Sequence, residues 1–203
     1  LGVGNIELGA VDQALLHDLS VGDLADLNTQ LNSEVAALQA HGLTVEVSDA
    51  AANALVSEGL HFTEGGVVVD GAHATHLGTS LKDLQKLGVS AVAIGAGDHL
   101  KVDLGAGDLS VGAGELPHFG VMNADGTVGV DTSHDVTLGV SGLGQFGQVE
   151  GLESGGELDL TSLGIDNIEL SMVSHAELSG LSAGGADLNA LLNSEVAALQ
   201  AHG

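Results

Sequence analysis

The sequence predicts an α+β fold that is rich in β-strand and built as one unit of a tandem repeat. Three features predict it: a long internal repeat, a recurring order of short helix, glycine and strand, and a later half of short alternating segments. Aliphatic residues supply nearly all of the apolar content, because 44% of the chain is hydrophobic and only 1% is aromatic. A core of small side chains favours thin, regularly stacked layers over one thick globular centre.

The long repeat joins residues 1–42 to residues 163–203, with 28 identities in 41 aligned positions and a one-residue deletion. Its last eleven residues, NSEVAALQAHG, are identical in the two copies. Since 163 − 1 = 162, the period is 162 residues. We therefore expect 1–162 to be one full period and 163–203 to begin the next, in a polypeptide that continues in both directions. The alternative is a single domain whose similar terminal segments pack pseudosymmetrically.

Within the period, a leucine precedes a glycine by four residues at three places, and an apolar segment follows each glycine. The glycines are Gly42, Gly59 and Gly88. Each stands where a left-handed residue would end a helix. The predicted helices are SEVAALQAH, DAAANALVSE and LKDLQKL, with N-caps at Asn32 or Ser33, at Ser48, and at Thr79 or Ser80. Helices this short need to pack on the strands that follow them, and this alternation favours parallel pairing.

From about residue 89 the helical pattern disappears. Short strands are predicted in VSAVAIGAG, HLKVDLGAG, DLSVGAG, GTVGV, DVTLGVSG, GELDLTSLG and NIELSMV. NADGT, residues 123–127, predicts a hairpin turn. Each period is thus expected to hold an α/β part over about 1–95 and a β-rich part over about 96–162, the latter solenoid-like or sandwich-like.

The charge balance excludes several classes of partner. The chain has 28 acidic residues against three basic ones, and its formal net charge is −25. Nucleic acids and anionic membrane surfaces are disfavoured, since both require cationic side chains. Membrane insertion is not expected either, because no run of about 18 apolar residues exists.

Carboxylates follow three Gly-Ala-Gly turns, at Asp98, Asp108 and Glu115, and Asp103 lies nearby. Stacked turns that present carboxylates and carbonyls suit Ca²⁺, which prefers six to eight oxygen ligands. The alternative is that these are glycine turns carrying solvated carboxylates. Calcium is the one cofactor that the sequence suggests.

Catalytic patterns are few in the sequence: it has no Walker loop and no arginine. We predict that the protein is not an enzyme. A polysaccharide-active enzyme on a β-solenoid is the least favoured alternative, because a sugar groove would require basic or aromatic residues.

THLGTSLKDLQKLGVSAVAIG, residues 75–95, and VSDAAANALVSEGLHF, residues 47–62, resemble segments of giant, acidic, Cys-free tandem-repeat proteins of Gram-negative bacteria, which are treated as surface or adhesin-like chains. The resemblance covers about a fifth of the chain. It implies an extracellular or cell-surface polypeptide of many repeats.

The expected function is therefore structural: a repeat of a bacterial fibre, adhesin stalk or surface layer, built by end-to-end packing. The expected partners are neighbouring repeats of the same chain or identical chains. A calcium-dependent extracellular binding module is the alternative. The residues predicted to contact neighbouring repeats are Ile6, Leu8, Val35, Leu38, Ile168 and Leu170.

Overall fold

The computed structural model shows a mixed fold of helices and strands, consistent with the predicted α+β class. It describes residues 5–11, 13–63, 65–107, 109, 116–130, 134–183, 190, 193–194, 196–197 and 200.

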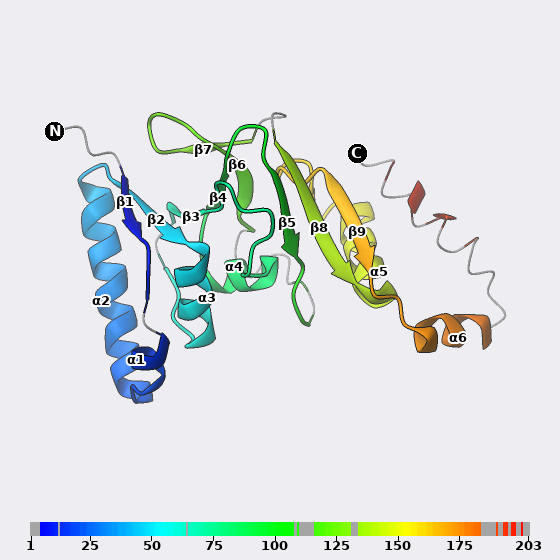
Figure 1. Cartoon of the computed structure of the whole chain (residues 1–203), viewed down its shortest axis with the longest axis horizontal. Helices are drawn as coiled ribbons and strands as arrows, with labels where there is room; N and C mark the ends of the chain where they lie inside the picture. The colour runs from blue at the N-terminus through cyan, green and yellow to red at the C-terminus, as the bar shows by residue number, and fades with distance from the viewer. Residues whose placement is uncertain are drawn as a thin grey trace.

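Two sheets organise the fold (Figure 1). The larger has the strand order β1-β2-β3-β4-β6-β7, and the smaller has the order β5-β8-β9. The strands are β1 (Asn5–Leu8), β2 (Thr44–Ser48), β3 (Val67–Asp70), β4 (Ala91–Ile94), β5 (His99–Asp103), β6 (His118–Met122), β7 (Val128–Gly129), β8 (Asp135–Ser141) and β9 (Asn167–Ser171). Neither sheet closes into a barrel within the described ranges.

Strand pairing within the two sheets is parallel except between β6 and β7, so the parallel prediction is confirmed. The exception is the hairpin predicted at NADGT. There the Asn123 amide donates to the Thr127 carbonyl at 2.7 Å, and the Gly126 amide donates to Asn123 at 3.0 Å. The Asp125 side chain accepts from the Thr127 hydroxyl at 2.7 Å, and this bond lowers the pKa of Asp125.

Helices connect most of the parallel strands. They are α1 (Gln13–His17), α2 (Val21–Ala40), α3 (Asp49–Ser57), α4 (Leu81–Leu87), α5 (Gly142–Ser154) and α6 (His175–Ala183). Ser48 and Ser80 cap α3 and α4 as predicted, each accepting from a backbone amide of the first turn. Gly42, Gly59 and Gly88 follow their helices with φ of 75°, 76° and 76°, as a left-handed stop requires.

The start of α2 differs from the prediction. Asn32 and Ser33 are not N-caps; they lie inside a 20-residue helix that begins after Ser20. Ser20 and Asp23 form a reciprocal capping box. Asn32 instead binds the loop after α3, accepting from the Thr63 amide at 2.7 Å and donating to the His61 carbonyl at 2.9 Å.

The later half also holds a helix that the sequence did not predict. The segment 142–154 forms α5, whose Phe146 and Val149 are buried against the core. The predicted strand GELDLTSLG is a turn in which Asp159 accepts from the Ser162 amide at 2.9 Å. Local side-chain bonding of this kind competes with strand pairing.

The main apolar core serves both sheets, and a small separate cluster of Val68, Ala91 and Ala93 lies on the larger sheet. The main core includes Val47 and Phe119 from the larger sheet, Val102 and Leu138 from the smaller, and Leu84 from α4. The core is continuous across residue 95, and β5 shows the predicted alternation, with Leu100 and Val102 inward and His99 and Asp103 outward. The segment 75–77 joins the edge of β5 through the parallel bridge between His76 and Lys101.

Candidate inter-repeat contact site

The two copies of NIEL are edge strands of different sheets. β1 lies at one end of the larger sheet beside β2, and β9 lies at one end of the smaller sheet beside β8. The two strands lie toward opposite ends of the molecule's long axis (Figure 1). Equal sequences thus pair with neighbours that lie in opposite directions along the chain: β2 follows β1, whereas β8 precedes β9.

The registers of the two pairings are compatible with each other. Ile6 faces Val45 and Leu8 faces Val47 across the first pairing. Their equivalents, Ile168 and Leu170, face Leu138 and Val140 across the second. Because both pairings are parallel, a NIEL strand placed between a β8-type strand and a β2-type strand would run in the same direction as both.

Equivalent apolar residues of the two copies of the repeated segment differ in burial where the copies have different neighbours. Ile6 is 38% exposed on β1, whereas its equivalent Ile168 is half-buried beside β8. In the helical part the difference is reversed: Val35 is 3% exposed, and its equivalent Val196 is 42% exposed. Leu8, Leu38 and Leu170 are half-buried and pack against the core. Each copy therefore exposes an apolar residue that the other copy covers.

The asparagine of NIEL bonds across the strand pair in both copies. The Asn5 amide nitrogen donates to the carboxylate of Glu46 on β2. The Asn167 amide nitrogen donates to Asp135 on β8 at 2.5 Å. Asp135 also contacts Nδ1 of His99 at 3.0 Å, which continues the polar row to β5.

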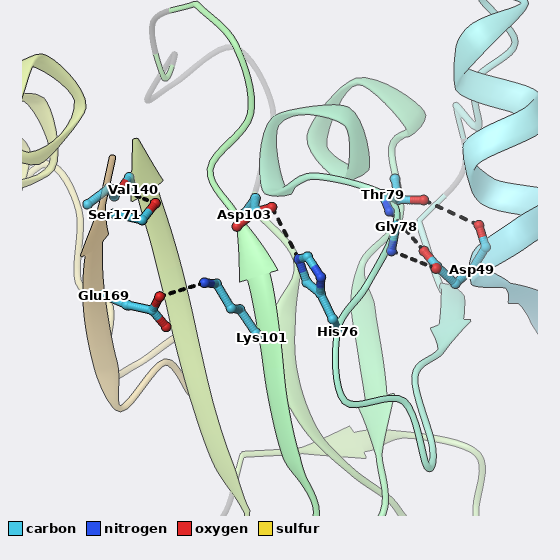
Figure 2. Close-up of polar contacts among 9 residues, drawn as sticks. All are labelled: Asp49, His76, Gly78, Thr79, Lys101, Asp103, Val140, Glu169 and Ser171. Carbon is cyan, nitrogen blue, oxygen red and sulfur yellow. Dashed lines mark hydrogen bonds and ion pairs between the residues drawn. The ribbon is translucent and has the colours of Figure 1, made fainter. Parts of the chain in front are cut away.

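The glutamate of NIEL forms an ion pair with a lysine in the second copy, and among the described residues it forms none in the first. Lys101 Nζ donates to Glu169 Oε1 at 2.8 Å, reaching from β5 to β9 across β8 (Figure 2). The glycine at position 139 of β8 allows this, because a Cβ there would lie 2.9 Å from Lys101 Cε. The hydrogen bond to Glu169 raises the pKa of Lys101.

The equivalent glutamate on β1, Glu7, lies opposite another glutamate, Glu46, in the strand register. Partial burial is the main cause that raises the pKa of Glu46, and the negative charges of Asp70 and Glu7 add to it. Like charges directly opposite across a strand pair are destabilising. The β1 edge therefore carries an excess of negative charge that the β9 edge does not.

Further contacts fix the loop between β3 and α4 beside β5. His76 Nε2 lies 3.1 Å from Asp103 Oδ2. At the start of α3, the Asp49 carboxylate accepts from the amides of Gly78 and Thr79 at 2.7 and 3.0 Å (Figure 2). At the other end of the same row, the Ser171 hydroxyl donates to the Val140 carbonyl at 3.3 Å. Together with the ion pair between Lys101 and Glu169, these bonds form a row of polar contacts that extends from α3 to β9.

The predicted calcium ligands are only partly described. Asp98 accepts from the His73 amide at 2.9 Å, and Asp103 contacts His76. Asp108 and Glu115 lie outside the described residues. Among the residues that the structure describes, no group of three or more metal-capable side chains is found.

A hollow of about 390 Å³ lies between the smaller sheet and the second copy of the helical segment. Its lining includes Phe146, Glu153 and Ile168 on one side, and Val196 and Gln200 on the other. Glu153 is 7% exposed and accepts from the Leu160 amide at 2.7 Å, so this carboxylate has a structural role.

Sequence reasoning selected the apolar residues of NIEL but missed its polar ones, Asn5 and Asn167 with Glu7 and Glu169. The signal was present, because these residues are identical in both copies. The partner Lys101 could not be found in this way, since nothing in the sequence places β5 two strands from β9.

No protein family, curated protein or solved structure matches the chain. In the part of the chain that the structure describes, no helix is long and apolar enough to cross a membrane.

Proposed function

We propose that this chain is a structural repeat of an extracellular bacterial fibre, adhesin stalk or surface-layer assembly, built by end-to-end packing of repeats. The observation that supports it is the opposite pairing direction of the two NIEL copies: β1 pairs with the later strand β2, and β9 pairs with the earlier strand β8. A strand that pairs downstream at one end and upstream at the other is suited to join successive units.

Repeats of this kind are stabilised by their intrinsic folding and by the interfaces between neighbours. The apolar residues of the repeated segment, Ile6, Leu8, Val35 and Leu38 with Ile168 and Leu170, supply the interface in this proposal. A net charge of −25 in 203 residues keeps such a polymer soluble and attracts cations to its surface.

The proposal is tested with longer chains of the same sequence. Residues 43–203 are appended once, twice and three times after Gly203, and each purified product is measured by small-angle scattering and electron microscopy. We expect the maximum dimension to grow by a constant step per added period, as for a rigid rod. A beads-on-a-string profile, or compact particles without an axial repeat, would contradict the fibre.

A further inference from the structure

We propose that the open edge of β9, together with the exposed residues Asn193, Val196 and Gln200, is a docking surface for residues 43–66 of another copy of this period. This inference rests on the proposed function and specifies its junction. The occupant is a β-strand followed by α3 and its loop, in the arrangement that residues 43–66 adopt against β1 and α2.

The strands β1 and β9 share the sequence NIEL at equivalent positions of the repeat. In the described structure β9 has β8 on one edge and no strand on the other, and we assign that open edge to the position that β2 takes beside β1. Transferring the observed register places Thr44 of the incoming copy opposite Asn167, Val45 opposite Ile168, and Glu46 opposite Glu169. The smaller sheet would then continue, in parallel, into the larger sheet of the next unit.

Polar side chains of the helical segment also have partners in the first copy that come from residues 43–66. In the first copy, Asn32 and Gln39 of α2 hold the loop after α3, and Gln39 donates to the Gly65 carbonyl at 2.7 Å. Their equivalents, Asn193 and Gln200, are exposed. Val196, equivalent to the buried Val35, is 42% exposed. Residues 43–66 of another copy would supply to Asn193 and Gln200 the loop partners that Asn32 and Gln39 have in the first copy.

Charge complementarity gives the junction a direction. The incoming strand brings Glu46 beside Glu169, which already binds Lys101 at 2.8 Å. In the first copy, Glu46 faces Glu7. Docking therefore moves Glu46 from a pair of two carboxylates to a cluster that includes an ammonium group. This exchange favours the β9 edge over a strand edge that has no cation.

The test exploits the absence of cysteine from the chain. The full chain carrying Glu169→Cys is mixed, in a glutathione redox buffer, with a synthetic peptide of residues 43–66 carrying Glu46→Cys. Glu169 is an exposed strand residue, so the substitution leaves the core intact. The proposed register brings the two Cα atoms within the roughly 4.4–6.8 Å that a disulfide spans. Peptides with Thr44→Cys or Ser48→Cys are the matched controls, because a two-residue shift of about 6.6 Å along the strand takes the thiol out of reach.

We expect at least tenfold more mixed disulfide with the Glu46→Cys peptide than with either control. Equal trapping of the three peptides, or no trapping at all, would overturn the proposal. A measurement without substitutions accompanies it: an excess of unmodified peptide should slow hydrogen exchange of the β9 amides at least tenfold. A peptide of residues 135–158, which has the same strand-then-helix order, should not slow it. Equal protection by that peptide would show a strand edge without specificity and would also overturn the proposal.

The two proposals fail separately. If the lengthened chains form rods but the Glu46→Cys peptide is not trapped preferentially, repeats assemble end to end through another surface. If the Glu46→Cys peptide forms the mixed disulfide preferentially but the lengthened chains do not form rods, β9 binds residues 43–66 and the proposed fibre is wrong.

Discussion

At the scale of single residues, two glycines hold successive chain segments at close range. The Phe62 amide donates to the Leu87 carbonyl, and the Phe119 amide donates to the Leu163 carbonyl, both at 2.6 Å. The glycine after each leucine has positive φ, and a Cβ on Gly88 or Gly164 would lie 2.2 Å from the phenylalanine carbonyl oxygen. These positions require glycine both for conformation and for space.

Gly88→Ala should therefore lower the free energy of unfolding by roughly 2–4 kcal/mol, from left-handed strain together with overlap against backbone atoms. Gly59→Ala is the matched control, because Gly59 has the same φ of 76° with nothing within 4 Å of its Cβ position. It should cost about 1 kcal/mol, from conformation alone. Urea denaturation measures the free energy of unfolding of both variants. An equal decrease in the two would show that the close approach of Gly88 to Phe62 does not contribute to stability.

Glu46 provides a residue-scale prediction with a pH dependence. Partial burial, then Asp70 and Glu7, raise its pKa in the folded state above 4.5, so the ionised side chain destabilises the fold at neutral pH. Lowering the pH through the raised pKa protonates Glu46 in the folded state first, and the destabilisation disappears. Glu46→Gln should stabilise the protein by roughly 0.2–1 kcal/mol at pH 7 and by less at pH 4. Thermal melts at the two pH values test this, with Glu34→Gln on the exposed side of α2 as control; an equal gain at both pH values would contradict it.

At the scale of elements, α5 shows tertiary packing overriding intrinsic preference. Its sequence GLGQFGQVEGLES contains four glycines, each of which disfavours a helix by about 1 kcal/mol relative to alanine. Phe146 and Val149, three residues apart, nevertheless lie on one face and are buried. Because these two side chains contribute to the core, the segment between β8 and β9 is helical although the sequence predicted no helix beyond about residue 89.

Two of these glycines should therefore be replaceable with a gain in stability. Gly144 and Gly151 are exposed within α5, and a Cβ on either would meet nothing within 4 Å. Each change to alanine should raise the free energy of unfolding by roughly 0.5–1 kcal/mol, since it reduces the conformational freedom of the unfolded chain. Denaturation of the single and double variants checks this. A loss of stability in both would show that the packing of α5 depends on its glycines.

At the scale of the whole molecule, the two ends of the fold are complementary. One end presents β1 with Ile6 exposed and Glu7 facing Glu46, and the other presents β9 with Glu169 bound to Lys101. The main apolar core connects them through both sheets.

Local signals in the sequence determined much of this protein: the 162-residue period, the left-handed glycines after the helices, the caps at Ser48 and Ser80, the hairpin at NADGT and the alternation of β5. Each of these depends on residues a few positions apart, or on direct identity between the copies. Tertiary structure alone decided that β1 and β9 present opposite edges, that Lys101 reaches Glu169 over Gly139, and that 142–154 is a helix. The physical reason is distance along the chain, because the partners in these contacts come together only when the strands pair and the core closes.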